Sequence, residues 1–190
     1  MAFGLHKTVV MVGMMGAGKS AVGKETARAL GVPFLDSDAE IETAANATIA
    51  EIFARDGEGF FRDKEARVIA RLLEGAPCIL SVGGGAFLRA DTRDKITEQG
   101  VSVWLKADLD TLWSRVRRKD TRPLLRTANP RQTLADLMKT REPFYAMANL
   151  TVPALAQYAI ETTAEKVIDA LQTRPDVLTR RPETPAKDTQ

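Results

Sequence analysis

The sequence predicts an α/β fold in which a mainly parallel sheet is covered by helices. Short apolar runs with the length of buried strands alternate with longer stretches that have the length of helices. The stretches between the runs are long enough for right-handed βαβ crossovers, which join parallel strands. An all-helical protein with apolar connectors is the alternative reading.

Five strands are expected in this pattern, and the fifth gives the weakest signal. They are predicted at residues 8–12, 33–35, 78–82, 101–105 and 150–152, with a helix at residues 19–30. Residues that accept hydrogen bonds from the first turn mark further helix starts. The candidate caps are Thr48 with Glu51, Asp91, Asp108, Asn129 before Pro130, and Thr162 with Glu165.

Three segments depart from the alternation. Residues 37–73 form a long, mostly helical insertion between two strands, and residues 119–128 are polar and rich in basic side chains. From about residue 173 the chain holds prolines, mixed charges and almost no apolar residues. We therefore expect residues 1–172 to form one domain and residues 173–190 to form a disordered tail.

Composition excludes several classes of protein. A formal net charge of +2 over 190 residues does not indicate binding to nucleic acid or a membrane. A single cysteine, Cys78, cannot form an intramolecular disulfide, which fits a reducing compartment. The single histidine, His6, lies before the first strand, so neither a zinc site nor Ser-His catalysis is expected. The protein is expected to be cytoplasmic.

Residues 13–20, here called the phosphate loop, carry the most specific motif in the chain. They read Gly-Met-Met-Gly-Ala-Gly-Lys-Ser between a strand and a helix. In such a loop the backbone N–H groups and the helix N-terminus face phosphates, the lysine reaches the outer phosphates, and the serine hydroxyl coordinates Mg²⁺. We therefore expect nucleotide contacts from the loop and its flank: Gly16, Ala17, Gly18, Lys19, Ser20 and Ala21.

The nucleotide motif does not belong to a GTPase. No Asn-Lys-x-Asp segment reads guanine, and the Asp-Gly-Glu-Gly run at residues 56–59 follows a helix rather than a strand. Asp36 and Asp38 follow the second strand, where ligands gather in open parallel sheets. They are candidates for a magnesium contact and a substrate contact. A polar turn capped by Ser37 or Asp38 is the equally weighted alternative.

Residues 83–85, here called the glycine loop, follow the third strand. Three glycines at a strand end let the backbone approach a ligand closely, although a flexible loop is the alternative.

Three arginines are further candidates for the site. Considered singly, Arg62, Arg122 and Arg141 read as ordinary solvated charges.

Taken together, the motifs resemble the shikimate kinase family. They occur in order over most of residues 7–172, and only the phosphate loop is specific alone. The set is residues 13–20, Asp36-x-Asp38, Phe61-Arg62-x-x-Glu65, Gly83-Gly84-Gly85, Arg122-Pro-Leu-Leu and Arg141-x-x-x-Tyr145. The resemblance implies a P-loop kinase of three-layer α/β/α type, with a five-stranded parallel sheet, a substrate-binding insertion near residues 37–67 and a lid near residues 117–129.

The resemblance also implies roles for single residues. Lys19, Asp38 and Arg122 would be catalytic, with Arg122 on the lid reaching the transferred phosphate. Ser20 would bind Mg²⁺ directly and Asp36 through water, while Arg115 would stack near the adenine of ATP. The shikimate carboxylate would lie between Arg62 and Arg141. The substrate-binding set is completed by Asp38, Gly83, Gly84 and Gly85.

The expected reaction is phosphoryl transfer from ATP to shikimate by a monomer. The resemblance implies that the loop after the last strand completes the adenine site, but residues 153–160 do not clearly match the family pattern. Gln157 and Tyr158 are the candidates there, and neither is assigned. A gluconate-type or nucleoside monophosphate kinase is the rival enzyme, since a sugar acid would also need an arginine clamp. The rival from another class is a non-catalytic ATP-binding regulator, which the intact Lys19, Ser20, Asp36 and Asp38 disfavour.

Overall fold

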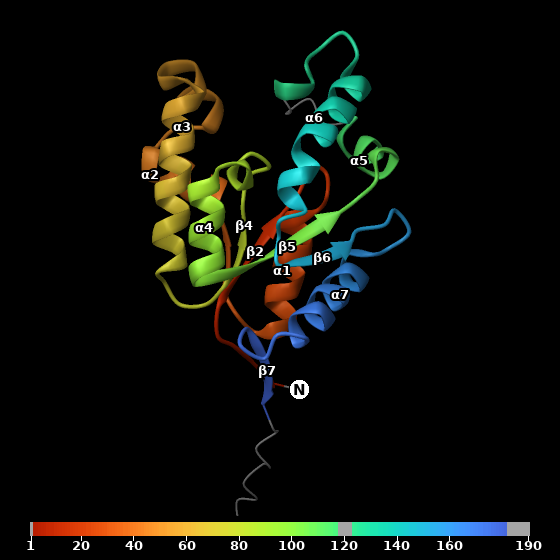
Figure 1. Ribbon diagram of the computed structural model, residues 1–190. Helices are drawn as coiled ribbons and strands as arrows, with labels where there is room; N and C mark the ends of the chain where they lie inside the picture. The colour runs from red at the N-terminus through yellow and green to blue at the C-terminus, as the bar shows by residue number, and fades with distance from the viewer. Residues whose placement is uncertain (1, 118–122, 182–190) are drawn as a thin grey trace, which may run out of the picture.

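A five-stranded parallel sheet forms the centre of the protein. The computed structural model describes residues 2–117 and 123–181, and the sheet has the strand order β3-β4-β2-β5-β6 (Figure 1). Its strands are β2 (Thr8–Val12), β3 (Phe34–Asp36), β4 (Ile79–Ser81), β5 (Gly100–Lys106) and β6 (Leu150–Pro153). All neighbouring pairs are parallel, which confirms the predicted fold class. Strand β2 has the predicted bounds, and the boundaries of the other strands differ from the predicted ones by at most one residue.

The middle strand explains why these apolar runs become strands. Val9, Val10, Met11 and Val12 of β2 have no exposed surface, because β4 and β5 flank the strand and helices cover both faces. A continuous apolar run is typical of a parallel strand that is buried on both sides.

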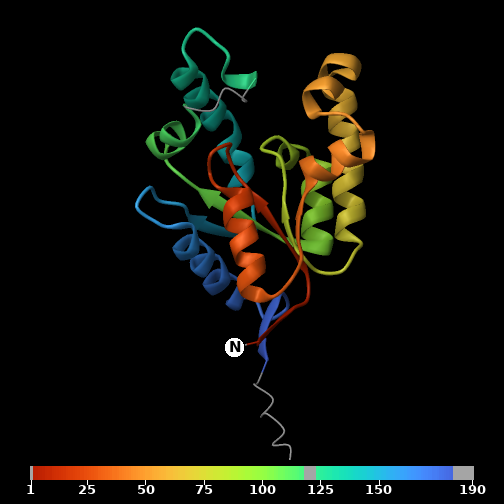
Figure 2. The ribbon, with the colours of Figure 1, turned by 180° about the vertical axis from the view of Figure 1, so that it is seen from behind.

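The helices lie in two layers around the sheet. In Figures 1 and 2, α1 (Lys19–Leu30) and α7 (Ile160–Gln172) cover one face. The other face is covered by α3 (Ile49–Leu73), α4 (Ala90–Gln99) and α6 (Pro130–Tyr145), while α5 (Leu109–Val116) lies near the phosphate loop. The predicted three-layer arrangement is therefore confirmed.

In the described part of the chain, no helix combines the length and apolar character needed to cross a membrane.

The long insertion consists of α2 (Ser37–Ala45) and α3. The expected capping box is present, because Thr48 accepts from the Glu51 N–H and Glu51 accepts from the Thr48 N–H. Gly57, with φ 83°, interrupts the helical geometry inside α3 and produces a kink. Ile41, Ile52 and Phe61 form a small hydrophobic cluster separate from the main core, so the insertion has its own packing centre.

Two of the predicted caps are wrong. Asp108 and Asn129 cap α5 and α6 as expected. The N-cap position of α4 is occupied by Arg89, and Asp91 lies in the first turn instead. The N-cap of α7 is Ala159, so Thr162 lies inside the helix. The spacing of Thr162 and Glu165 matches a capping box, but the same spacing occurs inside an amphipathic helix because polar and charged residues line its solvent face.

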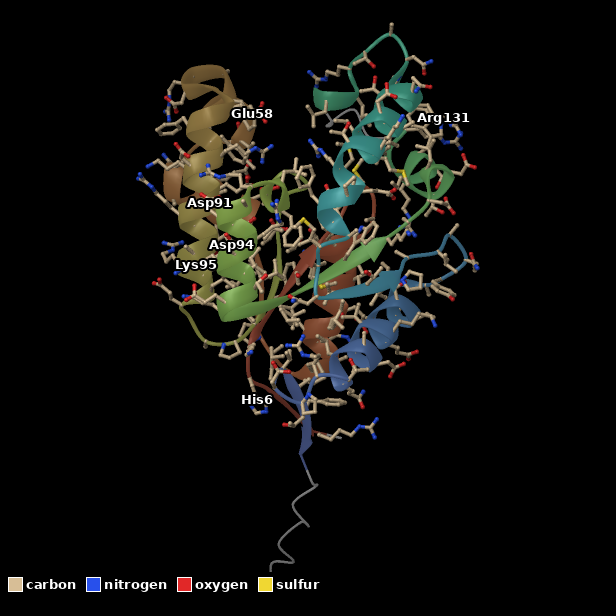
Figure 3. All side chains as sticks on the ribbon, viewed as in Figure 1. His6, Glu58, Asp91, Asp94, Lys95 and Arg131 are labelled. Carbon is tan, nitrogen blue, oxygen red and sulfur yellow. The ribbon has the colours of Figure 1, made fainter. Side chains whose placement is uncertain are left out.

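The prediction of a disordered tail is wrong for the described residues beyond 173. Strand β7 (Leu178–Arg181) pairs antiparallel with β1 (Ala2–Leu5), at the end of the molecule away from α3 and α6 (Figure 3). Val177 and Leu178 are buried in the main core. The partner strand is at the other end of the chain, so local composition does not reveal the pairing. Residues 182–190 lie outside the described residues.

Candidate active site

The phosphate loop, the acidic pair and the glycine loop meet at one edge of the sheet. Strands β2, β3 and β4 run parallel, so their carboxyl ends lie together, and Ser81 pairs in register with Met11 and Asp36. A cavity of about 570 Å³ opens at this edge. Its lining includes Lys19, Ser20, Asp36, Asp38, Gly84 and Arg115.

The phosphate loop has the backbone conformation that its glycines predict. Gly16 and Gly18 have φ values of 81° and 93°, which side-chain-bearing residues rarely adopt. Gly18 is the N-cap of α1, so the helix N-terminus opens on the cavity. The Lys19 ammonium donates to the carbonyl oxygens of Gly13 at 2.9 Å and Met14 at 3.0 Å. The loop therefore directs N–H groups, a helix dipole and an ammonium to one place, which suits phosphate binding.

Arg115 holds the phosphate loop from α5. Its Nη1 donates to the carbonyl oxygen of Gly16 at 3.1 Å and reaches that of Ala17 at 3.4 Å. The residue also lines the cavity. Its expected stacking on adenine stays a prediction.

Asp36 both caps a helix and contacts the phosphate loop. Its Oδ1 accepts from the backbone N–H of Asp38 at 3.0 Å, so Asp36 itself caps α2, rather than Ser37 or Asp38. Its Oδ2 accepts from the Ser20 hydroxyl at 2.9 Å. A hydroxyl and a carboxylate beside a phosphate loop are suitable for Mg²⁺, which usually takes one or two protein oxygens together with phosphates and water. Within residues 2–117 and 123–181, no group of three or more His, Cys, Asp and Glu side chains could hold a metal.

Four charged side chains come together around the glycine loop. A Cβ atom on Gly83 would lie 2.9 Å from Glu65 Oε1 and 3.2 Å from Asp38 Oδ1. On Gly84 it would lie 3.2 Å from Arg141 Nη1, and on Gly85 it would lie 2.6 Å from Arg62 Nη1. These close approaches require glycine, so the loop is a packed surface rather than a flexible connection.

The carboxyl groups at this loop have shifted pKa values. Burial raises the pKa of Asp38, the neighbouring charge of Asp36 raises it further, and Lys19 opposes the shift. Burial also raises the pKa of Glu65, opposed by Arg62, whose Nη1 lies 2.7 Å from Glu65 Oε2. A raised pKa means that ionising Asp38 and Glu65 costs free energy in the folded protein.

Two arginines face the same loop from different helices. Arg62 comes from α3 and Arg141 from α6, where only 8% of Arg141 is exposed. One turn after Arg141, Tyr145 donates its hydroxyl to the Gly84 carbonyl at 2.6 Å. A pair of guanidinium groups beside glycine backbone can bind a carboxylate with defined orientation.

The structure thus brings together most of the predicted site residues and adds three. Ser81, Glu65 and Tyr145 contact predicted residues but were not assigned to the site. The last two were already part of the spacing motifs that contain Arg62 and Arg141, so helical neighbours at i+3 and i+4 were the available signal. Arg122 lies outside the described residues, and its role stays a prediction.

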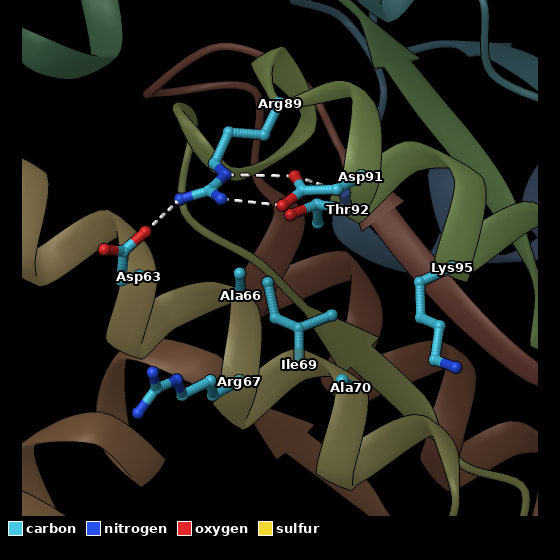
Figure 4. Close-up of a pocket in the computed structure, with 9 residues that line it drawn as sticks. All are labelled: Asp63, Ala66, Arg67, Ile69, Ala70, Arg89, Asp91, Thr92 and Lys95. Carbon is cyan, nitrogen blue, oxygen red and sulfur yellow. Dashed lines mark hydrogen bonds and ion pairs between the residues drawn. The ribbon is translucent and has the colours of Figure 1, made fainter.

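A second cavity lies outside this site, between α3 and α4 (Figure 4). Its volume is about 420 Å³. At one end Arg89 contacts Asp63 at 2.7 Å and Asp91 at 2.6 Å. Asp63 follows Arg62 in the chain, so this ion pair joins α3 to the segment after the glycine loop.

Comparison with known proteins agrees with the geometry. The family model described as shikimate kinase matches residues 15–172. The chain is 67% identical over 177 residues to a shikimate kinase of Ruegeria pomeroyi, covering 93% of this chain and 91% of the relative. It is 67% identical over 174 residues to a shikimate kinase of Cereibacter sphaeroides, covering 92% and 87%.

Solved structures give the same answer. A shikimate kinase from Acinetobacter baumannii in complex with shikimate superposes with a TM-score of 0.83 at 38% identity, covering 88% of this chain and 93% of that chain. A gluconokinase from Sinorhizobium meliloti superposes with a TM-score of 0.61 at 19% identity, covering 89% and 93%, and shares the fold alone. The family match, the identities and the arrangement of the site lead to one conclusion: the chain belongs to the shikimate kinase family.

Proposed function

We propose that this protein transfers the γ-phosphate of ATP to the 3-hydroxyl of shikimate, giving shikimate 3-phosphate and ADP in aromatic amino acid biosynthesis. One observation carries the proposal. Arg62 and Arg141 approach the glycine loop from two helices, and Asp38 reaches the same loop beside the phosphate loop. An acceptor that carries both a carboxylate and hydroxyl groups fits this arrangement.

The donor half of the site is the phosphate loop with α1. The backbone N–H groups of residues 16–20 and the N-terminus of α1 would hold the β- and γ-phosphates. Lys19 would exchange its bonds to the loop carbonyls for the γ-phosphate. Arg115 would keep the loop in shape from α5 and extend toward the nucleotide base.

Ser20 and Asp36 would hold Mg²⁺, with Ser20 binding it directly and Asp36 through water. Their oxygens lie 2.9 Å apart at the edge of the cavity. The ion would neutralise charge on the β- and γ-phosphates when it is bound with ATP.

The acceptor half of the site would orient the hydroxyl that reacts. Arg62 and Arg141 would bind the carboxylate from two sides, with the glycine loop as the floor. Asp38 would accept hydrogen bonds from the ring hydroxyls. Two charged anchors at opposite ends of a rigid ring fix both its position and its rotation, which supplies the proximity that phosphoryl transfer needs.

The reaction exchanges one P–O bond for another. The acceptor oxygen forms a bond to the γ-phosphorus, and the bond between that phosphorus and the β–γ bridging oxygen breaks. The hydroxyl proton passes to Asp38, whose buried position raises its pKa and makes it a better proton acceptor. ADP leaves with the bonding electrons. Arg122 from the lid, which lies outside the described residues, is expected to reach the phosphoryl group in flight and to exclude water.

Two further features belong to this proposal. Residues 37–67, with their own hydrophobic cluster, would act as a substrate-binding subdomain, and residues 117–129 would act as the lid. The enzyme is expected to be a cytoplasmic monomer without nucleic-acid or membrane partners.

A coupled ADP-release assay tests the proposal against its rivals. Purified protein with Mg²⁺ and ATP is assayed separately with shikimate, gluconate and nucleoside monophosphates. We expect turnover with shikimate and at most trace turnover with the others. Preferred turnover of gluconate or a nucleotide would replace the substrate, and ATP binding without turnover of any acceptor would indicate a non-catalytic regulator.

A further inference from the structure

Tyr145 lies beneath the glycine loop, behind the residues that line the cavity. It is the last residue of α6 and has no exposed surface. Its hydroxyl donates to the Gly84 carbonyl at 2.6 Å, and its ring packs beside Trp104 of β5, with the ring centroids 6.2 Å apart. Burial raises the pKa of Tyr145, opposed by the charge of Arg141 and a hydrogen bond with that residue, so the hydroxyl remains protonated at neutral pH.

This hydrogen bond fixes the direction of one peptide group. The Gly84 carbonyl and the Gly85 N–H belong to the same trans peptide, so they point in opposite directions. Since the carbonyl points to Tyr145, the N–H points away from it. Within the described residues, no group accepts a hydrogen bond from the Gly85 N–H.

The same peptide lies between the two arginines. Arg141 Nη1 is 3.2 Å from the position of a Cβ on Gly84, and Arg62 Nη1 is 2.6 Å from the position of a Cβ on Gly85. Arg141 and Tyr145 are one helical turn apart on α6, so this helix fixes both a guanidinium group and the peptide next to it.

We propose that Tyr145 is a positioning residue for the acceptor: its hydroxyl orients the Gly84–Gly85 peptide so that the Gly85 N–H donates to the carboxylate held by Arg62 and Arg141. This inference rests on the proposed function. Without the tyrosine hydroxyl, the part-buried Gly84 carbonyl has lost its donor, and the peptide can rotate toward another partner. The acceptor site then loses a preorganised N–H group, while the phosphate loop is unchanged.

The Tyr145→Phe variant tests this inference because it keeps the ring and removes only the hydroxyl. We expect the shikimate Kd, measured by calorimetric titration, to rise about 5- to 30-fold, equivalent to ~1–2 kcal/mol. The shikimate KM should rise similarly, kcat at saturating shikimate should change by less than about 3-fold, and the ATP Kd should stay unchanged. Thr8→Val is the matched control, since it removes a buried hydroxyl that bonds a backbone group, the Cys78 N–H, at the amino end of β2 and so at the edge of the sheet opposite the site.

The outcomes separate this inference from the proposed function. If wild-type protein did not bind shikimate, the proposed function would fail before any variant was compared. If wild-type protein bound shikimate and folded Tyr145→Phe bound it equally well, the positioning role would be wrong. A parallel loss of shikimate and ATP affinity, or an equal effect of Thr8→Val, would also overturn it, because both results indicate a general effect on folding.

Discussion

At the level of single residues, the acceptor site depends on charges that are held close to backbone. Arg62 and Arg141 are far apart in the sequence, yet both reach the glycine loop. Arg62 keeps its position through Glu65, which is almost fully buried and only 2.7 Å away. A guanidinium group fixed in this way loses little side-chain entropy when a carboxylate binds.

Removing either arginine should weaken binding of the phosphate acceptor, shikimate, without affecting binding of the phosphate donor, ATP. Truncating one partner of a desolvated charged contact costs about 2–5 kcal/mol. Arg62→Ala or Arg141→Ala should therefore weaken shikimate binding about 30-fold to several thousand-fold, with ATP affinity nearly unchanged in calorimetric titrations. Arg67→Ala, an exposed arginine on the same helix as Arg62, is the control and should bind both ligands normally. Wild-type shikimate affinity in a clamp variant would exclude the carboxylate clamp.

Glu65 gives a second prediction, concerning stability and pH. Burial raises its pKa in the folded protein above the ordinary value of 4.5, so the folded state binds the proton more tightly than the unfolded state. The stability contributed by this group therefore falls as pH rises from 4.5 through the folded pKa, and is constant above it. Arg62 opposes the shift.

Arg62→Ala should enlarge this pH dependence. We expect the free energy of unfolding of this variant to approach that of the wild type near pH 4.5. At pH 8 it should be lower than that of the wild type by about 1–3 kcal/mol, as measured by denaturant unfolding at the two pH values. The double variant Arg62→Ala with Glu65→Gln should lose most of the difference between the two pH values. A deficit in Arg62→Ala that is equal at both pH values would show that the Glu65 charge is not involved.

At the level of elements, α3, α6 and the glycine loop meet at the proposed acceptor site. The loop can lie against both helices only because it has no side chains. The Arg89 ion pairs hold α3 to the start of α4 from outside the site (Figure 4). The position of α3 relative to the loop therefore decides whether Arg62 can reach the acceptor.

A pair of Gly→Ala variants tests this arrangement. The added methyl group of Gly85→Ala would lie against the Arg62 guanidinium, so we expect shikimate affinity to fall at least ~10-fold while ATP affinity is retained. Gly59→Ala adds the same methyl group to α3 where no atom lies within 4 Å. It should leave binding unchanged and stabilise the helix by about 0.5–1 kcal/mol. Normal shikimate binding by Gly85→Ala would mean that the loop tolerates displacement of Arg62.

At the level of the whole molecule, the two chain ends stabilise the end opposite the active site. Strands β1 and β7 pair there, and His6 Nε2 lies 2.8 Å from Thr179 Oγ1. The lone histidine is therefore remote from the carboxyl edge of the sheet, as its position in the sequence predicted. Both strands also lie outside residues 15–172, the part matched by the family model.

Deleting residues 174–190 should destabilise the protein without removing its activity. Burial of a valine or leucine side chain contributes about 1.5–3 kcal/mol, so loss of Val177 and Leu178 should lower stability by at least ~2 kcal/mol. The melting temperature should fall by roughly 4–8 °C, while turnover at 25 °C is retained because β7 pairs with β1 at the end of the molecule opposite the carboxyl edge of the sheet. Deletion of residues 182–190 alone is the control and should leave the melting temperature unchanged. Equal melting temperatures for both deletions would show that β7 does not stabilise the fold.

The sequence by itself determined the elements whose signals are local. The phosphate loop between a strand and a helix, the apolar run of β2, and the caps at Thr48, Asp108 and Asn129 follow from nearby residues. The resemblance to the shikimate kinase family also predicted roles for Asp38, Arg62 and Arg141, and these roles stay predictions. The predictions of the loop, the strand and the three caps succeeded because backbone conformation and capping depend on interactions within a few residues.

Tertiary structure alone decided the features that join distant parts of the chain. The pairing of β7 with β1, the use of Asp36 as both cap and Ser20 partner, and the Tyr145 contact with Gly84 all bring together segments that local patterns treat separately. The predicted caps at Asp91 and Thr162 were wrong because packing places the observed N-caps two and three residues earlier, at Arg89 and Ala159. Long-range contacts depend on the packing of the whole chain, so the composition of one segment cannot specify its partner.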